Sequence, residues 1–334
     1  MNIVVLDGHT LNPGDNTWSA LEQLGRLTVH ARTPPADLLT RAAGADVLLT
    51  NKTLIGAKEL AQLPALKFIA VLATGHNVVD VVAARKRGIP VANVPAYGTD
   101  SVAQHVFALL LELANATGEH ARSVAAGDWA ASPDFCYWRR PVLELRGLRL
   151  GIVGFGRIGR RVAELGHAFG MKLLVAARAG RNGEQRPRSD IFLGTGPLEG
   201  WPIPARHLPL GQFFAEADVV SLHCPQIKEN FQFINRAVLR GMKPGAFLIN
   251  TARGTLIHEG DLLHALQEGW IAGAALDVLA TEPPPPDHPL FGAPRCVITP
   301  HVAWASGAAR RRLMAVAVEN VAAFIQGRPR NIVN

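Results

Sequence analysis

The chain has 334 residues, of which 48% are hydrophobic and 18% charged, and its formal net charge is +7. This length leaves room for two domains, each with a sizeable core. The basic residues are scattered, apart from the runs Arg139-Arg140 and Arg310-Arg311-Arg312, and no basic stripe with interleaved aromatic residues is present. The charge therefore favours an anionic small-molecule substrate and cofactor and argues against nucleic acid as a partner.

Cysteine usage and hydropathy exclude further classes of protein. The three cysteines, Cys136, Cys224 and Cys296, form neither a disulfide framework nor a zinc-binding pattern. No apolar stretch reaches the roughly 20 residues that a membrane span requires. Residues 1–7 are typical of a strand and lack the basic start of a signal peptide. We expect a cytoplasmic protein with no metal site and no membrane partner.

The first hundred residues alternate between short apolar runs and helical patterns, which predicts a small parallel α/β domain. Strands are expected at residues 3–6, 47–50, 68–72 and 91–93, and helices at residues 18–25 and 79–87. Residues 100–126 then form one long helix pattern, with Thr99 or Asp100 as its N-cap. Its apolar residues lie on nearly all sides, so we expect it to be buried between layers or domains and to favour a homodimer.

The motif LGIVGFGRIG lies in the middle of the chain, after an apolar run at 148–153 and before a helical pattern at 157–169. Gly154 suits a tight turn, Gly156 lets the backbone approach a pyrophosphate, and Gly159 lets the helix pack close to the strand. As a bare pattern the motif is also compatible with an ordinary glycine turn. The strand before it and the helix after it indicate a dinucleotide-binding loop.

The second half of the chain continues the α/β alternation and predicts a doubly wound parallel sheet. Strands are expected at 172–177, 218–223, 246–250, 272–278 and 296–299, with helices between them such as 260–268. Residues 179–207 are rich in Gly, Pro and Arg, which indicates a long loop or hairpin insertion near the adenosine end of the cofactor. A last helix, 306–326, is expected to return to the first domain.

The fold class is therefore α/β, with two Rossmann-like or flavodoxin-like domains and an active site in the cleft between them. We expect a substrate domain of residues 1–99 plus 303–334 and a nicotinamide-dinucleotide-binding domain of residues 100–302. Hinges are expected near residues 94–100 and 299–303, so that binding can close the cleft and exclude water.

Three charged side chains, Arg253, Glu282 and His301, follow predicted strands of the second domain. They can converge, because ligands of open α/β sheets bind at the carboxyl ends of the strands. A nicotinamide-dependent dehydrogenase of 2-hydroxy acids needs a cation for the carboxylate, a proton donor and acceptor, and a carboxylate that orients this group. Taken singly, Arg253 is also compatible with a surface ion pair, and His301 with a structural role.

Several strings resemble the D-isomer-specific 2-hydroxyacid dehydrogenase family, namely "NTARGTLIHEGDLLHAL", "GAALDVLATEPPPPDHPL" and "VITPHVAWAS". The string "LATGHNVVDVVAARKRGIPVANVPAYGTDSVAQHVFALLLEL" resembles in particular its glycerate dehydrogenase branch, which includes hydroxypyruvate and glyoxylate reductases. The similarity covers nearly the whole chain. It implies an oxidoreductase that transfers hydride between NAD(P)H and C2 of a small 2-oxo or D-2-hydroxy acid, from hydroxypyruvate or glyoxylate to D-glycerate or glycolate.

The resemblance also implies roles for single residues. His301 would exchange a proton with the 2-oxygen, and Glu282 would hydrogen-bond His301 and raise its pKa. Arg253 would bind the substrate carboxylate and 2-oxygen through its planar fork. The implied substrate-binding residues are Ala73, Thr74, Gly75, Arg253 and Trp304. A plain strand-to-helix turn is the alternative for the loop at 73–75, and core or interface packing is the alternative for Trp304.

Cofactor contacts follow from the same family pattern. The glycine loop would bind the pyrophosphate, the residues after strand 218–223 would line the adenosine, and the nicotinamide would lie near the residues after later strands. The implied contacts are Gly154, Phe155, Gly156, Arg157, Ile158, His223, Cys224, Pro225, Thr251, Ala252, Asp277 and His301. Cys224 is expected to be a wall of this site and not a nucleophile.

One departure concerns the choice of cofactor. An NAD-specific fold places Asp or Glu about 20 residues after the glycine loop, on the ribose 2′-hydroxyl. Here Arg178 follows the strand at 172–177, and the first carboxylate is Glu184. Because a guanidinium can pair with a 2′-phosphate, we hypothesise that Arg178 contacts the cofactor and that NADP is preferred to NAD. The alternative is that these arginines decorate a solvated insertion.

Other possibilities stay open at this point. The substrate could be another D-2-hydroxy acid, and one branch of the family consists of nucleotide-sensing transcriptional co-regulators. Gln104 stands where relatives often have Glu, which affects a hinge more than the chemistry. Residues 135–138 lie in a segment that can reach a neighbouring subunit of a homodimer.

Overall fold

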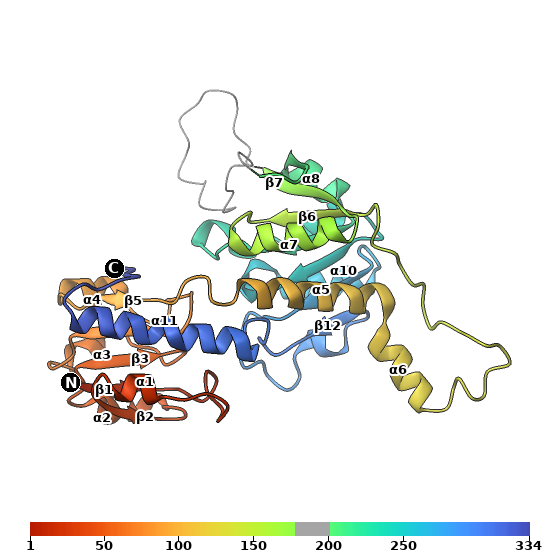
Figure 1. Ribbon diagram of the computed structural model, residues 1–334. Helices are drawn as coiled ribbons and strands as arrows, with labels where there is room; N and C mark the ends of the chain where they lie inside the picture. Colours follow the sequence, from red (N-terminus) through yellow and green to blue (C-terminus); the bar gives the residue numbers. More distant parts are fainter. Residues whose placement is uncertain (178–200) are drawn as a thin grey trace, which may run out of the picture. The chain divides into compact units, whose positions relative to one another are not determined.

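Contacts divide the chain into two compact units, each drawn in Figure 1. Met1–Gly98 and Trp304–Asn334 form the N-terminal unit, and Thr99–Ala303 form the central unit. The computed structural model describes residues 1–177 and 201–334. The domain boundaries expected from the sequence lie one residue from the boundaries of these two units. Which unit binds the substrate and which binds the cofactor stays a prediction.

The N-terminal unit is built on a five-stranded sheet in which every neighbouring pair of strands is parallel. Its elements are β1 Asn2–Val5, α1 Ser19–Glu22, β2 Arg26–Val29, α2 Leu38–Ala42, β3 Val47–Thr50, α3 Ala57–Ala61, β4 Phe68–Val71, α4 Val81–Lys86, β5 Val91–Ala92 and α11 Gly307–Ile325. The strand order is β2-β1-β3-β4-β5. α1 and α11 cover one face of the sheet, and α2, α3 and α4 cover the other.

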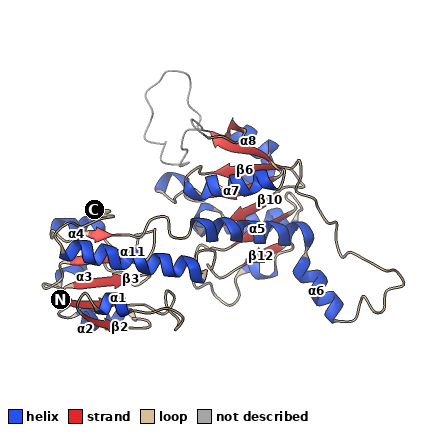
Figure 2. Ribbon diagram, viewed as in Figure 1, coloured by secondary structure: helices blue, strands red, loops and turns tan. Residues whose placement is uncertain are grey.

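The central unit has a parallel sheet of seven strands within the described residues, in the order β12-β11-β10-β9-β6-β7-β8. Its elements are α5 Thr99–Asn115, α6 Thr117–Ala125, β6 Arg149–Val153, α7 Arg157–Ala168, β7 Lys172–Ala177, β8 Ala205–Pro209, α8 Leu210–Glu216, β9 Val219–Leu222, α9 Arg236–Gly241, β10 Phe247–Asn250, α10 Glu259–Gln267, β11 Gly273–Leu276 and β12 Cys296–Ile298. One apolar core packs α5 and α7 on one face, and a second packs α8, α9 and α10 on the other (Figure 2). The α/β class with two parallel sheets is thus confirmed.

The prediction of one helix over residues 100–126 is wrong, because Ala116 interrupts it. Ala116 has φ 51° and ψ 39°, in the left-handed region, so α5 ends before it and α6 begins after it. The Glu112 carboxylate accepts hydrogen bonds from Thr117 Oγ1 at 2.7 Å and from the Gly118 backbone N at 3.0 Å. These bonds give the first turn of α6 an acceptor that the broken α5 no longer supplies. No helix in the described part of the chain combines the length and apolar character that crossing a bilayer demands.

The sequence pattern misses six short elements, which are β2, β8, α2, α3, α8 and α9. β2 and β8 are edge strands with mostly exposed side chains, so no apolar run reveals them. The interpretation of residues 179–207 as a long loop or hairpin insertion is wrong for 205–207, which belong to β8 and pair in parallel with β7. Residues 178–200, including Arg178, lie outside the described residues.

Candidate active site

The strand order of the central unit reverses between β6 and β9, and ligands of open α/β sheets bind at such a switch point. Gly154 follows β6 with φ +96°, in the left-handed region that favours glycine. A Cβ atom on Gly154 would lie 2.5 Å from the backbone N of Cys224, which follows β9. The loops after the two strands therefore approach each other only because residue 154 has no side chain.

The other two glycines of the loop differ in their surroundings. A Cβ atom on Gly159 would lie 2.1 Å from the Gly154 carbonyl oxygen, so α7 packs directly against the loop. A Cβ atom on Gly156 would meet no heavy atom of the described residues within 4 Å. Gly156 is the N-cap of α7 and caps it with no side chain, so the amides of the first turn keep their donors for a ligand. This open, amide-lined space fits the pyrophosphate of a dinucleotide.

The side chains of this loop separate into buried and accessible ones. The Phe155 side chain is fully buried, so only its backbone can contact a ligand. Arg157 is exposed and Ile158 is partly exposed, at the first two positions of α7. Each of these three residues stays a predicted cofactor contact.

The loop after β9 carries His223, Cys224 and Pro225. Burial lowers the pKa of His223 to about 3, so this imidazole is neutral at physiological pH. The Ser221 hydroxyl lies 2.8 Å from His223 Nε2. Burial raises the pKa of the Cys224 thiol to about 12, which leaves too little thiolate for a nucleophile. Both side chains thus suit a neutral wall beside the glycine loop.

His301 and Glu282 form a direct pair. His301 Nδ1 lies 2.6 Å from Glu282 Oε2, and Glu282 Oε1 accepts a hydrogen bond from the Leu279 backbone N at 3.1 Å. Because an ionised carboxylate only accepts hydrogen bonds, Nδ1 of His301 carries a proton. Nε2 is then the ring atom left for exchanging a proton with a substrate. The two side chains are 27% and 32% exposed, so this exchange is accessible from solvent.

The backbone around His301 is held by Asp277, which follows β11. His301 has φ 53°, and its N–H donates to the carbonyl oxygens of Asp277 at 2.8 Å and Thr299 at 3.0 Å. The Asp277 carboxylate accepts hydrogen bonds from the backbone N of Val302 and of Ala303, both at 2.9 Å, and from Thr299 Oγ1 at 2.6 Å. The resemblance places Asp277 near the nicotinamide. The contacts found here hold the loop at 299–303, and a cofactor contact stays a prediction.

Arg253 lies in the loop after β10, where its backbone is braced by Asn250. Asn250 is fully buried, donates from Nδ2 to the Arg253 carbonyl oxygen at 2.8 Å and accepts from the Ala252 backbone N at 3.0 Å. A Cβ atom on Gly254 would lie 1.9 Å from the backbone C of Leu279, so this loop packs against the segment that leads to Glu282. Arg253 itself is exposed.

The three proposed catalytic side chains follow β10, β11 and β12, which are neighbours in the parallel sheet. Arg253, Glu282 and His301 therefore lie along one edge, the same edge at which Gly154 follows β6. Thr251 also follows β10, and its Oγ1 is buried with no hydrogen-bond partner among the described residues. An orphaned hydroxyl in this position fits a missing ligand such as a nicotinamide dinucleotide, and neighbouring Ala252 is partly exposed.

The predicted substrate loop follows β4 in the N-terminal unit. Thr74 Oγ1 donates to the Val94 carbonyl oxygen at 2.8 Å, and Asn93 Nδ2 donates to the Thr74 carbonyl oxygen at 2.7 Å. Ala73 accepts from the Val94 backbone N at 3.0 Å, while the amides of Thr74 and Gly75 donate to no acceptor within the described chain. Three hydrogen bonds thus hold this loop, and its two remaining amides can serve as donors for a carboxylate.

Trp304 packs within the same unit, edge-to-face with Tyr97 at 6.2 Å between ring centroids. Its contribution to a substrate pocket stays a prediction.

Sequence reasoning missed the residues that hold the site together. Three such residues act through backbone loops that only folding brings near the site. They are Asn250, His105, which contacts Thr299, and Asp277, which braces the loop at 299–303. A signal was available, since Asn250 and Asp277 are polar residues at the ends of strongly apolar runs. Such residues are buried when they follow a central strand and need hydrogen-bond partners there.

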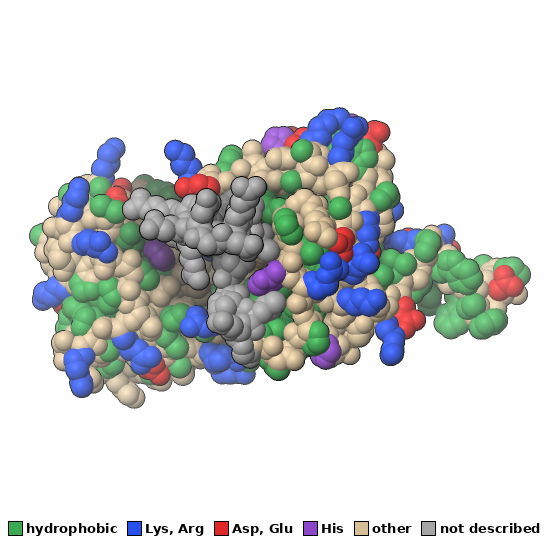
Figure 3. Space-filling view, turned by 90° about the horizontal axis from the view of Figure 1, so that it is seen from above, with side chains coloured by type: hydrophobic (Ala, Val, Ile, Leu, Met, Phe, Trp, Pro, Cys, Tyr) green, Lys and Arg blue, Asp and Glu red, His purple; other side chains and the backbone are tan. Residues whose placement is uncertain are grey.

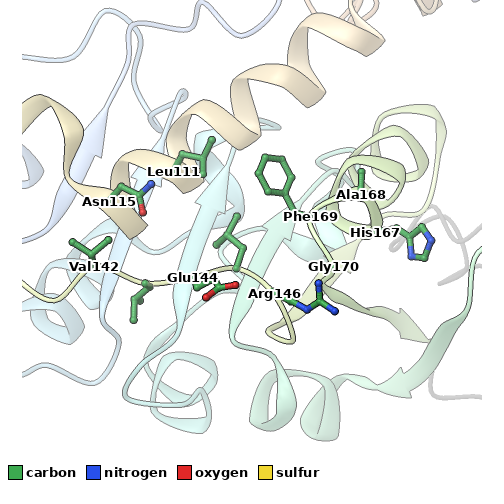
Figure 4. Close-up of a pocket in the computed structure, with 11 residues that line it drawn as sticks. Leu111, Asn115, Val142, Glu144, Arg146, His167, Ala168, Phe169 and Gly170 are labelled. Atoms are coloured by element: carbon green, nitrogen blue, oxygen red, sulfur yellow. The ribbon is translucent and has the colours of Figure 1, made fainter.

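A pocket of about 700 Å³ lies elsewhere in the central unit, between the end of α5, the segment before β6 and the end of α7 (Figure 4). It is lined by Leu111, Asn115, Val142, Leu143, Glu144, Leu145, Arg146, His167, Ala168, Phe169 and Gly170. None of the predicted site residues is among them. The end of α7 and the start of β6 mark the amino ends of the strands, so this pocket lies at the sheet edge opposite to the proposed chemistry.

Comparison with known proteins agrees with this geometry. A family model described as "D-isomer specific 2-hydroxyacid dehydrogenase, NAD binding domain" matches residues 107–303. The chain is 43% identical over 343 residues to the hydroxypyruvate reductase of Blautia hydrogenotrophica, and the match covers 100% of both proteins. It is 40% identical over 301 residues to the glycerate dehydrogenase of Methylorubrum extorquens, covering 90% of this chain and 88% of that protein.

Solved structures show the same fold. The NADPH-dependent glyoxylate/hydroxypyruvate reductase of Sinorhizobium meliloti, in complex with NADP and malonate, has a TM-score of 0.80 and 27% identity over 99% of this chain and 96% of that one. A protein of Thermus thermophilus has a TM-score of 0.83 and 37% identity over 100% of both chains. The motifs, the two parallel sheets and these relatives lead to one conclusion: the chain belongs to the D-isomer-specific 2-hydroxyacid dehydrogenase family.

Proposed function

We propose that this NAD(P)-dependent oxidoreductase reduces hydroxypyruvate or glyoxylate to D-glycerate or glycolate. The observation that carries the proposal is the His301–Glu282 pair, 2.6 Å apart, on the sheet edge that also carries Arg253 and the glycine loop. The relatives in Blautia hydrogenotrophica and Methylorubrum extorquens are a hydroxypyruvate reductase and a glycerate dehydrogenase, which supports this choice of acid.

The proposed chemistry divides between the residues as follows. Arg253 binds the substrate carboxylate and the 2-oxygen, because a guanidinium offers parallel N–H donors to both. His301 donates the Nε2 proton to the 2-oxygen as the C=O double bond is reduced, and is then reprotonated from solvent. Glu282 holds His301 through Nδ1 and stabilises the imidazolium before the transfer. A bound nicotinamide dinucleotide supplies the hydride to C2 of the acid.

The substrate carboxylate offers a second contact in this proposal. The free amides of Thr74 and Gly75 follow β4 and would bind it beside Arg253. The meeting of this loop and of Trp304 with the sheet edge that carries His301 stays a prediction.

The residues that would hold the cofactor are those of the glycine loop, the wall after β9 and the loop after β10. The open space at Gly156 and the orphaned Thr251 hydroxyl support this assignment. NADP is the proposed preference, because Arg178 comes directly after β7 and no carboxylate follows until Glu184. The Sinorhizobium meliloti reductase is NADPH-dependent and its structure contains NADP, which supports the same choice.

The testing experiment compares initial rates of NADPH and NADH oxidation with hydroxypyruvate, glyoxylate and pyruvate. We expect the highest kcat/KM with NADPH and one of the first two acids. A preference for NADH would refute the cofactor proposal and leave the enzyme proposal intact. Turnover of pyruvate alone would assign the protein to another acid. No turnover with any pair would favour a co-regulator of the same fold.

We also propose that the enzyme is a homodimer, formed through the segment between α6 and β6. This segment exposes Trp129, Phe135, Trp138 and Val142, with Phe135 89% exposed, and the apolar side chains gather on it in Figure 3. Arg139 Nε donates to Ser123 Oγ at 3.1 Å and so fixes the segment to α6. An apolar surface on a fixed segment, next to the pocket at the end of α5, suits a second copy of the chain.

Sedimentation velocity tests the homodimer. We expect a dimer for the wild type and a monomer for Phe135→Ser combined with Trp138→Ser. Phe231→Ser, at another exposed phenylalanine of the central unit, is the matched control and should stay dimeric. A monomeric wild type at micromolar concentration would refute the proposal. The cytoplasmic location expected from the sequence stays a prediction.

A further inference from the structure

His105 lies in α5 and reaches the cluster that holds the loop of His301. His105 Nε2 is 3.0 Å from Thr299 Oγ1 and 3.4 Å from Asp277 Oδ1. The His105 side chain is 21% exposed, and the Asp277 side chain is fully buried. None of the roles that the family resemblance implies falls on residue 105, so the contact needs its own explanation.

The protons of this cluster can be counted. Thr299 has one hydroxyl hydrogen, and its oxygen lies 2.6 Å from Asp277 Oδ1, which can only accept when it is ionised. The hydrogen therefore points at Asp277, and the Thr299 oxygen is left as an acceptor for His105. Both oxygens near Nε2 are then acceptors, so Nε2 of His105 carries a proton and donates to them.

The charge on Asp277 is maintained by these donors. Burial opposes ionisation of its carboxyl, but hydrogen bonds from His105, from Thr299 and from the backbone N–H groups of Ala303 and Val302 outweigh burial and hold its pKa below the usual value. A carboxylate without His105 would keep its charge in a dry site with fewer donors, which is costly.

The loop that depends on this carboxylate has an unfavourable backbone. His301 is a non-glycine residue at φ 53°, a strained conformation that persists only where the surroundings hold it. Its N–H bonds to the Asp277 carbonyl oxygen, and the Asp277 carboxylate binds the next two amides, of Val302 and Ala303. Any tilt of Asp277 would therefore move the His301 imidazole relative to Glu282.

We infer that His105 is a positioning residue for His301, acting as an Nε2–H donor that completes the hydrogen-bond shell of Asp277 and Thr299 and ties α5 to the loop at 299–303. This inference rests on the proposed function, because it assigns His301 the proton transfer. The inference assigns this hydrogen-bonding role to His105 and not to the neighbouring Gln104 of α5, whose side chain is exposed.

Two variants separate the hydrogen bond from simple packing. His105→Leu removes the donor, and we expect kcat with hydroxypyruvate to fall by about 10- to 100-fold, because an error near 1 Å in a reacting group costs this much. KM for NADPH should change by less than about threefold, since the glycine loop is untouched. His105→Gln keeps a donor near the Nε2 position and should recover most of kcat. His207→Leu, at an exposed histidine of β8, is the matched control with wild-type kinetics.

A second measurement does not depend on any variant folding or on turnover. Long-range proton–nitrogen correlation spectra of the wild type at neutral pH should show the His105 ring with its proton on Nε2. A proton on Nδ1 alone overturns the inference, as does wild-type kcat in folded His105→Leu or equal loss in His105→Leu and His105→Gln. An inactive wild type, or full activity in His301→Gln, would instead refute the proposed function.

Discussion

The two parallel sheets of this protein each have a switch point, and the proposed cofactor site uses only one of them. In the N-terminal unit the strand order reverses between β1 and β3, and Asp7 follows β1 there. Its carboxylate accepts hydrogen bonds from the backbone N of Asn51 at 2.7 Å, Lys52 at 2.6 Å and Thr53 at 2.8 Å. The protein's own anion thus occupies the amides that an α/β crevice offers.

The switch point of the central unit is built the opposite way. Gly154, Gly156 and Gly159 follow β6, and the amides at the start of α7 have no side-chain cap. Within residues 1–177 and 201–334 no side chain caps these amides, which leaves them as donors for an anion, as in a phosphate site. Both units thus have a switch point, and they differ in whether a side chain of the described residues accepts from the backbone amides beside it.

The largest effect is expected from removing the proton donor of the central unit. His301→Gln should lower kcat with hydroxypyruvate by about 10²- to 10⁴-fold, the usual contribution of general acid–base catalysis. Glu282→Gln should have a smaller effect, because His301 remains. Steady-state kinetics measures both, with circular dichroism as the control for folding. Near-normal turnover in His301→Gln would show that the chemistry lies elsewhere.

Two alanine substitutions in the glycine loop separate a glycine needed for packing from a glycine proposed to contact the cofactor. Gly159→Ala places Cβ 2.1 Å from the Gly154 carbonyl oxygen, so we expect a loss of about 2–4 kcal/mol in the free energy of unfolding. In Gly156→Ala the new Cβ meets no atom of residues 1–177 or 201–334 within 4 Å, and stability should stay within about 1 kcal/mol of the wild type. The substitution should still weaken NADPH binding. Chemical denaturation and fluorescence titration with NADPH measure the two quantities.

A full affinity for NADPH in Gly156→Ala would contradict the position proposed for the pyrophosphate. Equal stability losses in both variants would contradict the packing argument at Gly159.

Asp7 already accepts from the backbone amides at the switch point of the N-terminal unit. Removing its carboxylate should therefore lower stability without changing the affinity for the cofactor. Asp7→Ala leaves three backbone amides without their acceptor, and we expect the free energy of unfolding to fall by about 2 kcal/mol. The Kd for NADPH should not change. Asp80→Ala, which removes a single helix-cap bond to Ala83 N, is the control and should cost about 1 kcal/mol. An altered Kd in Asp7→Ala would overturn the separation of the two crevices.

The smallest effect concerns acid stability of the central unit. The folded pKa of Asp277 is held below its ordinary 3.8, so its contribution to stability is complete above that value and is lost as pH falls through the folded pKa. Wild-type stability should therefore decline more steeply below pH 4 than that of Asp277→Asn, whose amide does not titrate. Urea denaturation at pH 3, 5 and 7 measures this. Parallel pH dependence in the two proteins would contradict it.

The sequence predicts where the candidate site lies but not how its loops are supported. Arg253, Glu282 and His301 are predictable as candidates because each follows an apolar run, and the carboxyl ends of parallel strands share one edge. The brace around them was missed, because Asn250 and His105 act on backbone atoms that are adjacent only after folding. The break at Ala116 was missed for a related reason, since the Glu112 carboxylate that supports it turns back from within α5.

The sequence by itself determined features of periodicity and of residue order along the chain. These are the strand-forming runs, the glycine spacing and the order of the charged residues after strands. These depend on local sterics and on apolar periodicity, which a single chain displays without its fold. The tertiary structure decided the rest. It placed the loop after β6 against the loop after β9, turned Nδ1 of His301 toward Glu282, and buried the Asp277 carboxylate among donors from α5 and the loop at 299–303. Those contacts are directional hydrogen bonds and close approaches between distant segments, and no local pattern encodes them.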